Sequence, residues 1–167
     1  WYVIKPEGEF LEYLQKANSS SSYKLFTNFN ELSSLRQLYD STKTGKISTK
    51  WSSYFPIYDK WLSSLKNEHI TLLEIGVQNG GSLEIWSKYF LNGFLFLGCD
   101  INPAITSLVY DDPRIKLSVG AASSTDVFEK NLNIANGKFD VIIDDGSHQS
   151  SDTINNFINY FNYLSPG

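Results

Sequence analysis

From His69 onward, short uninterrupted apolar runs alternate with segments that carry apolar residues at helical spacing. The apolar runs cover residues 70–75, 94–99, 115–119 and 139–143, and the helical segments cover 81–91, 125–135 and 151–164. A strand that is apolar on both faces must be covered on both faces, which is typical of parallel sheets with crossover helices. The alternation therefore predicts an α/β fold with a parallel central sheet. Ligands in such sheets bind outside the carboxyl ends of the strands.

The region before this alternation predicts helices joined by polar segments. Apolar residues recur three or four positions apart in three places: Phe10, Leu11 and Leu14; Leu32, Leu35 and Leu38, with Asn30 as a cap; and residues 54–65, with Pro56 in the first turn. Residues 18–22 read as a Ser/Asn linker and residues 40–50 as a loop. We divide the chain into a helical lead-in over residues 1–50 and a main domain over residues 51–167.

Composition and charge exclude several classes of protein. With 41% hydrophobic and 15% aromatic residues, the chain has enough apolar material for a core and is not disordered. Its 14 basic and 18 acidic residues leave no basic footprint for a nucleic acid. No stretch approaches the length of a membrane span, which also argues against a membrane partner. A small-molecule or saccharide acceptor is the expected partner, and a homo-oligomer stays open.

The ends of the chain and its cysteine content carry two further expectations. The chain begins at Trp1, contains no methionine and stops on Ser165-Pro166-Gly167, a turn signal that normally leads into another element. We expect an excerpt of a longer protein whose remaining strands would follow Gly167. The N-terminus lacks the layout of a signal peptide, and the one cysteine, Cys99, cannot form an internal disulfide. Both observations favour the cytoplasm.

A glycine-rich turn follows the first predicted strand, with the sequence E-I-G-V-Q-N-G-G-S from Glu74 to Ser82. A dinucleotide-binding G-x-G-x-x-G motif would need glycine at Gln78, and a P-loop would need lysine at Ser82, so neither motif fits. The pattern that fits is E-x-G-x-x-x-G. Asp100 ends the next strand 24 residues after Gly76, where nucleotide-binding βαβ units place a carboxylate for the ribose. Many other α/β proteins also combine a glycine turn with such an aspartate.

A second polar cluster, D-D-G-S-H, follows the fourth predicted strand. Adjacent carboxylates such as Asp144 and Asp145 repel each other unless a cation or a donor group separates them. Mg²⁺ prefers carboxylate oxygens, and a nearby histidine such as His148 can remove a proton from a hydroxyl group. In the alternative, structural interpretation, Asp144 caps the next helix and His148 is a solvated surface residue.

The runs L-L-E-I-G-V-Q-N-G-G-S-L, G-C-D-I-N-P and I-I-D-D-G-S-H together resemble those of class I S-adenosylmethionine-dependent methyltransferases. Within that class they are similar to the macrolide-sugar O-methyltransferases of the mycinamicin and macrocin type, the cephalosporin-hydroxylase-like proteins and related bacterial sugar methyltransferases. The resemblance covers residues 51–167. It implies a Rossmann-like methyltransferase fold and metal-assisted O-methylation of a hydroxyl group on a sugar, a sugar-containing natural product or a polysaccharide.

The resemblance also implies roles for individual residues. S-adenosylmethionine would be bound by Glu74, Gly76, Gly80 and Ser82 at the methionine end, Asp100 at the ribose, Ile101 and Ser123 at the adenine, and Asp144 near the amino group. Asp145 would bind Mg²⁺, and His148 would be the general base. Many relatives carry an acidic residue where this chain has the turn 120–123, and their second acidic metal ligand would follow Gly167.

Three alternatives remain open from the residues alone. In the first alternative, the protein is a methyltransferase that needs no metal, and Asp144 and Asp145 contact the cofactor and stabilise the fold. Alternatively, it is a module that binds S-adenosylmethionine or a nucleotide without turnover. A nicotinamide enzyme is disfavoured by Gln78. We interpret the other conspicuous residues as structural. Cys99 is expected to be a buried thiol and His69 a surface residue. The aromatic side chains expected to pack in a helix are Trp51, Tyr54, Tyr58 and Trp61, and the lesser alternative is that Tyr54 reaches the cofactor.

Overall fold

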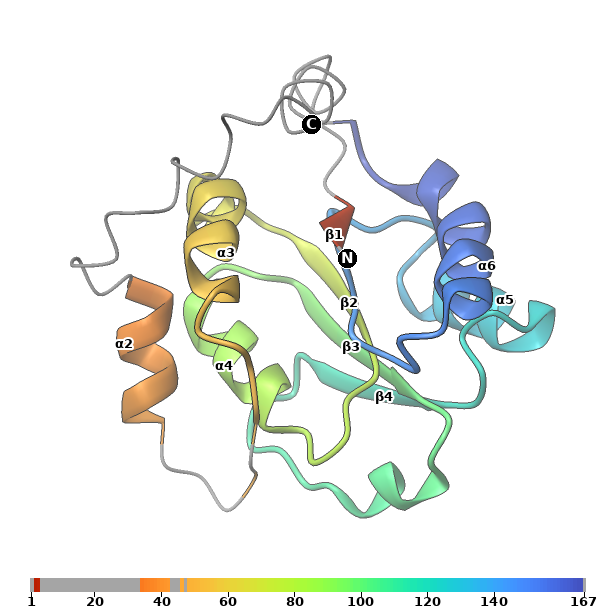
Figure 1. Ribbon diagram of the computed structural model, residues 1–167, viewed down its shortest axis with the longest axis horizontal. Coiled ribbons are helices and arrows are strands. Elements are labelled where there is room, and N and C mark those ends of the chain that lie inside the picture. The colour runs from red at the N-terminus through yellow and green to blue at the C-terminus, as the bar shows by residue number, and fades with distance from the viewer. Residues whose placement is uncertain (1, 4–33, 43–45, 47, 167) are drawn as a thin grey trace.

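The computed structural model describes residues 2–3, 34–42, 46 and 48–166, and within them a five-stranded sheet forms the centre of the protein (Figure 1). The strand order is β1-β5-β2-β3-β4. Four strands are parallel: β2 (Thr71–Ile75), β3 (Leu95–Asp100), β4 (Ile115–Val119) and β5 (Val141–Asp144). Each begins and ends within two residues of the predicted bounds, so the predicted parallel sheet is confirmed.

Helices cover both faces of this sheet (Figure 1). One face carries α2 (Ser34–Ser41), α3 (Tyr54–Leu62) and α4 (Gly81–Tyr89), and the other carries α5 (Thr125–Ile134) and α6 (Ser150–Tyr160). The structure also contains short 3₁₀ helices, which are labelled η2 (Ser63–Leu65), η3 (Pro103–Ser107) and η4 (Phe161–Tyr163). Among the described residues, no helix is both long enough and apolar enough to cross a bilayer.

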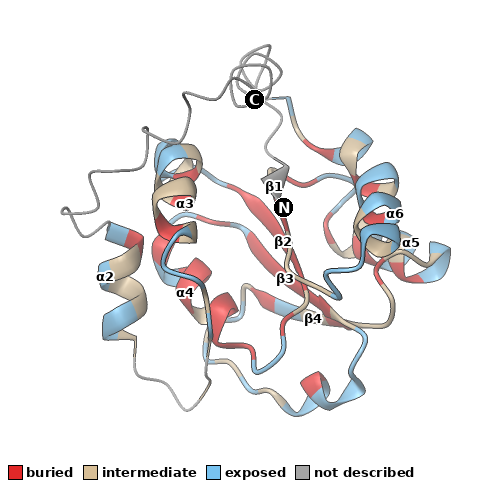
Figure 2. Ribbon diagram, in the orientation of Figure 1, coloured by how far each residue is buried: buried red, intermediate tan, exposed pale blue. Residues whose placement is uncertain are grey.

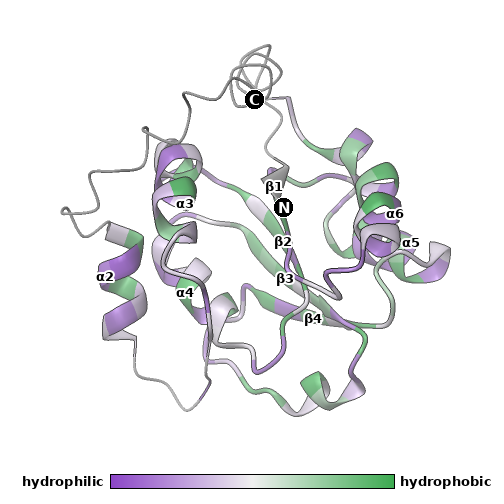
Figure 3. Cartoon of the chain, in the orientation of Figure 1, coloured by the Kyte–Doolittle hydropathy of each residue, from purple (hydrophilic) through white to green (hydrophobic). Residues whose placement is uncertain are grey.

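Strands β2, β3 and β5 are buried and mostly hydrophobic along almost their whole length, whereas β4 is only partly buried (Figures 2 and 3). Successive side chains of a strand point to opposite faces, so Leu72 packs with the core beneath α3 and α4, and Leu73 packs with the core beneath α5 and α6. Both leucines are 0% exposed. The apolar runs of the sequence therefore supply two cores at once, and the polar loops at the strand ends are left to form a site.

Only part of the predicted helical lead-in over residues 1–50 falls within the described residues. Leu35 of α2 is 1% exposed and packs in the same core as α3 and α4, as the predicted helix requires. The expectations for residues 10–14, the linker 18–22, the cap at Asn30 and Leu32 lie outside the described residues. The division at residue 50 stays a prediction.

Three local features differ from the expectations. Strand β1 (Tyr2–Val3) pairs antiparallel with β5 in the region predicted to be helical, because two residues are too few to show a period. The predicted helix 151–164 ends at Tyr160, and η4 and a bridge between Leu164 and Phe139 follow. Trp51 was expected to pack in a helix but is 71% exposed, because it precedes α3.

The C-terminal end of α4 is held by one arginine on the neighbouring strand connection. Arg114 donates hydrogen bonds to the carbonyl oxygens of Ser87 (2.9 Å), Leu91 (3.0 Å) and Gly93 (3.2 Å) and forms an ion pair with Asp112 at 2.6 Å. The last carbonyl groups of a helix have no partners within the helix, and a cation there also complements the helix dipole. Arg114 therefore fixes the helix whose N-terminal end borders the candidate site.

We predict that Arg114→Met lowers the free energy of unfolding by about 2 kcal/mol, because hydrogen bonds to a charged group are each worth about 1.5–3 kcal/mol. Arg114→Lys should recover only part of the loss, since an ammonium lacks the planar fork of donors. Urea titration measures both values. Lys116→Met on the exposed side of β4 is the matched control, and an equal loss there would contradict the proposed role of Arg114.

Candidate active site

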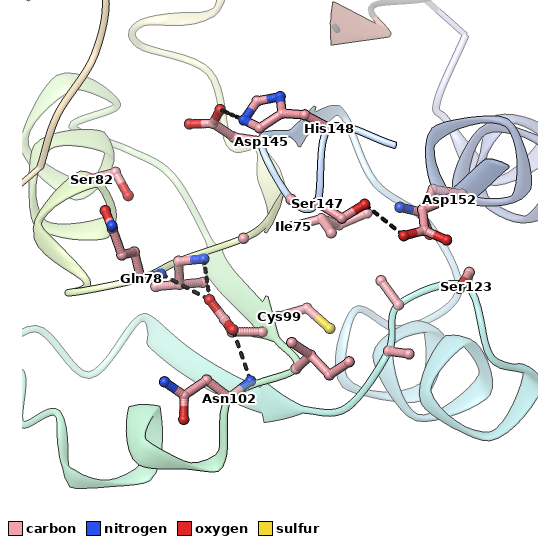
Figure 4. A pocket seen from close by; sticks show the side chains of 18 of the residues that line it. Ile75, Gln78, Ser82, Cys99, Asn102, Ser123, Asp145, Ser147, His148 and Asp152 are labelled. Atoms are coloured by element: carbon pink, nitrogen blue, oxygen red, sulfur yellow. Dashed lines mark hydrogen bonds and ion pairs between the residues drawn. The ribbon is translucent and has the colours of Figure 1, made fainter. Parts of the chain in front are cut away.

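A cleft of about 780 Å³ lies at the carboxyl ends of the parallel strands, where the loops after β2, β3, β4 and β5 meet (Figure 4). The register pairs Ile75 with Cys99 on one side and with Asp144 on the other, so the strand ends align. The chain order reverses between β2 and β5, which is the place where open α/β sheets bind ligands. Residues 48–50 form another part of the wall.

The turn after β2 contains two glycines with positive φ, and at both an added Cβ would overlap a neighbouring residue. Gly76 has φ +84°, and a Cβ there would overlap the Asp145 carbonyl and lie 2.7 Å from the Cα of Gly146. Gly80 has φ +76° at the N-terminal end of α4, and its carbonyl accepts a hydrogen bond from the Tyr110 hydroxyl at 3.0 Å. The turn after β2 can therefore lie directly against the turn after β5 only because Gly76 has no side chain.

Asp100 organises this turn by accepting hydrogen bonds from backbone groups, and those from Gln78 and Asn102 are drawn as dashed lines in Figure 4. Its Oδ2 accepts from the N–H groups of Val77 (2.8 Å) and Gln78 (2.9 Å), and its Oδ1 accepts from Asn102 N–H at 2.9 Å. An ionised carboxylate has about four lone-pair positions, so one acceptor position remains for a ligand. These bonds hold Gln78 at φ +50°. Asp100 lines the cleft, and its predicted contact with a ribose stays a prediction.

Lys50 is a cleft-lining residue that the sequence analysis does not identify. Its ammonium donates to Glu74 Oε1 at 3.1 Å and to Asp145 Oδ2, and its side chain is only 7% exposed. Glu74 is 0% exposed and also accepts from the Ser82 hydroxyl at 2.6 Å. Burial lowers the pKa of Lys50, but the two neighbouring carboxylates outweigh burial and raise the pKa well above its ordinary value. Lys50 is therefore a fixed cation at the wall of the cleft.

The two adjacent aspartates point to different partners. Asp144 accepts from the Asn156 side chain at 2.9 Å and from Gly146 N–H at 3.2 Å, whereas Asp145 pairs with Lys50. The separation that adjacent carboxylates require is thus supplied by donor groups of the protein. Asp145 lines the cleft, but Asp144 lines a smaller cavity between β5 and α6. The predicted contact of Asp144 with the cofactor stays a prediction.

His148 lies on the same side of the cleft as Asp145 (Figure 4). Its Nε2 is 3.5 Å from Asp145 Oδ1, and its side chain is 69% exposed. The backbone of His148 has φ +56°, in the left-handed region that non-glycine residues rarely adopt. Next to it, the Ser147 hydroxyl donates to Asp152 at 2.6 Å, which ties the turn to the start of α6. His148 is therefore accessible to a second molecule and close to an acidic group.

The opposite side of the cleft is less polar. Ile101 is 74% exposed at the cleft, and Ser123 with the rest of the turn 120–123 forms the neighbouring wall. Cys99 is 0% exposed, burial raises the pKa of its thiol, and its Sγ donates to the Gly120 carbonyl at 3.7 Å. The interpretation of Cys99 as a buried thiol is confirmed. The wall has the apolar and backbone groups that a flat heterocycle can pack against.

The structure brings most predicted site residues together at this one cleft. Those that line it are Gly76, Ser82, Asp100, Ile101, Ser123, Asp145 and His148. Glu74 lies beneath the wall and Gly80 behind it against Tyr110. Among the described residues, no group of three acidic, histidine or cysteine side chains forms a ready metal site. The packing interpretation of Tyr54 fits its ring contacts with Trp51 and Tyr58.

Nothing in the sequence distinguishes Lys50 from its neighbours. Lys43, Lys46 and Lys50 all fall in a polar stretch before the main domain, and no motif includes them. The tertiary structure selects Lys50, because the Tyr39 hydroxyl of α2 accepts from Lys50 N–H at 3.1 Å and donates to the Ser48 carbonyl.

The comparisons with known proteins agree with this geometry. No protein-family model matches the sequence. The chain is 33% identical over 129 residues to the 8-demethyl-8-alpha-L-rhamnosyl tetracenomycin-C 2'-O-methyltransferase of Streptomyces olivaceus, covering 72% of this chain and 33% of that protein. It is 30% identical over 144 residues to the mycinamicin VI 2''-O-methyltransferase of Micromonospora griseorubida, covering 82% and 34%. The chain is a homologue of the macrolide-sugar O-methyltransferases.

Solved structures of a methyltransferase of this group share the fold. The MycE methyltransferase of the mycinamycin biosynthetic pathway, in complex with Mg and SAH, matches 95% of this chain and 44% of its own, with a TM-score of 0.63 and 27% identity. Its complex with Mg, SAH and mycinamycin VI matches with a TM-score of 0.56 and 29% identity, over 68% and 30%. The predicted resemblance and methyltransferase fold are confirmed. The chain spans about one third of the length of the curated macrolide-sugar O-methyltransferases it matches.

We predict that Gly76→Ala lowers the free energy of unfolding by at least about 3 kcal/mol, since left-handed backbone costs about 1–2 kcal/mol and the methyl group also overlaps backbone atoms. Gly137→Ala is the matched control, because Gly137 has φ +89° but nothing within 4 Å of the added Cβ. It should lose only about 1 kcal/mol. Urea unfolding measures both. Equal losses would show that the approach of Gly76 to Asp145 is unimportant.

Proposed function

We propose that this chain carries the cofactor-binding part of an S-adenosylmethionine-dependent O-methyltransferase that acts on a hydroxyl group of a sugar-containing small molecule. The observation that carries the proposal is the convergence of the glycine turn, Asp100 and the Asp145–His148 pair on one cleft. The homologues support the reaction class, because their names describe O-methylation of glycosylated natural products.

The residues around the cleft fit S-adenosylmethionine. The Gly76 turn leaves backbone exposed to a ligand, Asp100 keeps one acceptor position for a ribose hydroxyl, and Ile101 offers an exposed apolar surface. Glu74, Lys50 and Asp145 together carry a net charge of −1, which favours a cationic ligand. The cofactor supplies a methyl group on a sulfonium that is already a good leaving group. The chain's own contribution is orientation and the exclusion of water.

His148 has the position of a general base. It is exposed at the cleft, so its imidazole can accept the proton of an acceptor hydroxyl, while the Asp145 carboxylate lies 3.5 Å from its Nε2. The Asp145 carboxylate is also a suitable ligand for Mg²⁺, which proteins bind through one or two carboxylates while the ion keeps several water molecules. Bound there, Mg²⁺ would supply positive charge that lowers the pKa of a hydroxyl group. Among the described residues, Asp145 does not belong to a group of three or more acidic, histidine or cysteine side chains that could hold a metal ion.

The acceptor we propose is a hydroxyl group on a sugar, a glycosylated natural product or a polysaccharide. The mycinamicin and tetracenomycin names of the homologues support this class. The cleft leaves His148 open to the outside, which suits an acceptor larger than a single sugar. The free buried thiol of Cys99 agrees with a cytoplasmic location, which we also propose.

We predict that His148→Ala in the full-length protein lowers kcat for methyl transfer by about 10²–10⁴-fold, the usual contribution of a general base. Transfer from labelled S-adenosylmethionine to a panel of glycosylated polyketides measures the rate. His69→Ala is the matched control, since His69 is exposed and stacks on Phe94 far from the cleft lining. An unchanged rate for His148→Ala removes the proposed base.

The metal requirement is tested separately by chelation. Treatment with EDTA should abolish transfer, and added Mg²⁺ should restore it, because Asp145 and the hydroxyl group would lose the shared cation. Undiminished transfer in EDTA would leave a metal-independent methyltransferase. Full binding of the cofactor with no transfer to any acceptor would instead favour a binding module.

We predict that S-adenosylhomocysteine binds in calorimetric titration while NAD does not, because Gln78 stands where a dinucleotide motif needs glycine. Asp100→Asn should weaken S-adenosylhomocysteine binding by about tenfold, since a charge-assisted hydrogen bond is replaced by a neutral one. Asp111→Asn is the control, as it is exposed and outside the cleft lining. Tighter binding of NAD would contradict the methyltransferase assignment.

A further inference from the structure

Lys50 reaches the strand ends from outside the sheet. The segment 48–50 is held by the Tyr39 hydroxyl of α2, and Lys46 just before it pairs with Glu84 of α4 at 2.6 Å. The segment is therefore anchored on two helices before it enters the wall of the cleft. This anchoring places the Lys50 ammonium between a fully buried carboxylate, Glu74, and the cleft-lining carboxylate of Asp145.

One ammonium thus balances two carboxylates that would otherwise repel each other. Glu74 is 0% and Lys50 7% exposed, so neither charge is screened well by water. The Asp145 side chain is 23% exposed and has its Oδ2 bonded to Lys50. A divalent cation on Asp145 would meet the positive charge of Lys50 at close range, and the two cations would compete for the same carboxylate.

We propose that Lys50 is a positioning residue of the active site, which holds the Asp145 carboxylate at the cleft through its ammonium and competes with a divalent cation for that carboxylate. The proposal rests on the proposed function, in which Asp145 binds Mg²⁺. Glu74 is the second partner that Lys50 retains when Asp145 is taken by the cation. The affinity of the site for a divalent cation then depends on how readily that cation displaces the Lys50 ammonium from the Asp145 carboxylate.

The test measures the affinity of the full-length protein for Mn²⁺ by electron paramagnetic resonance, with S-adenosylhomocysteine present. The informative variant is Lys50→Gln combined with Glu74→Gln, because it keeps the local net charge of −1 and leaves no buried charge unpaired. We expect Mn²⁺ to bind at least about tenfold more tightly than to wild type, as expected for removing a cation beside a carboxylate. Since net charge is unchanged, the gain reports competition for Asp145.

Two further variants complete the test. The single variant Lys50→Arg keeps the positive charge beside Asp145. Its affinity for Mn²⁺ should therefore stay within about threefold of wild type, well short of the tenfold change expected when the charge is removed. Asp145→Asn should abolish Mn²⁺ binding. Loss of binding in Asp145→Asn without a gain in the double variant overturns the role of Lys50 and leaves the proposed function intact. Wild-type affinity in Asp145→Asn removes the metal from the proposed function, and the role of Lys50 falls with it.

Discussion

The close approach of two turns at the carboxyl edge of the sheet is the constraint on which the site depends. The Gly76 backbone lies directly against Asp145 and Gly146, Gly76 N–H donates to the Cys99 carbonyl at 2.8 Å, and Asp145 N–H donates to the Ile75 carbonyl at 2.8 Å. These contacts continue the sheet for one residue past the strands. They bring the turns after β2, β3 and β5 together, so that side chains far apart in sequence share one cleft.

The carboxylates at these strand ends are each paired with a donor group of the protein. Asp100 accepts backbone N–H groups, Asp144 accepts an amide and Asp145 accepts an ammonium. Each carboxylate at the strand ends therefore has its own donor before any ligand arrives. Groups held in place before a ligand binds need little reorganisation, and such preorganisation is the source of much of the electrostatic stabilisation in enzymes. It also explains how adjacent aspartates coexist within the described structure.

The sequence predicted the strands and their order of succession well, because apolar runs that need cover on both faces have few other solutions. It located the cleft-lining residues Gly76, Asp100, Asp145 and His148, because function in such folds lies just after the strands. It did not predict β1, which is too short for a period, or the end of α6 at Tyr160. In α6 the apolar spacing marks a helix but not its buried face, since Ile154 and Ile158 are 57% and 63% exposed while Asn156 is buried.

The sequence alone determined the fold class, the glycine turn and the identity of most groups at the strand ends, since these follow from local period and from positions next to strands. Only the tertiary structure decided which groups face each other. It paired Asp144 with the side chain of Asn156, and it brought Lys50 across 95 residues of chain to Asp145. Pairings of this kind depend on where α2, α4 and β5 pack, and no local pattern in the sequence encodes that distance.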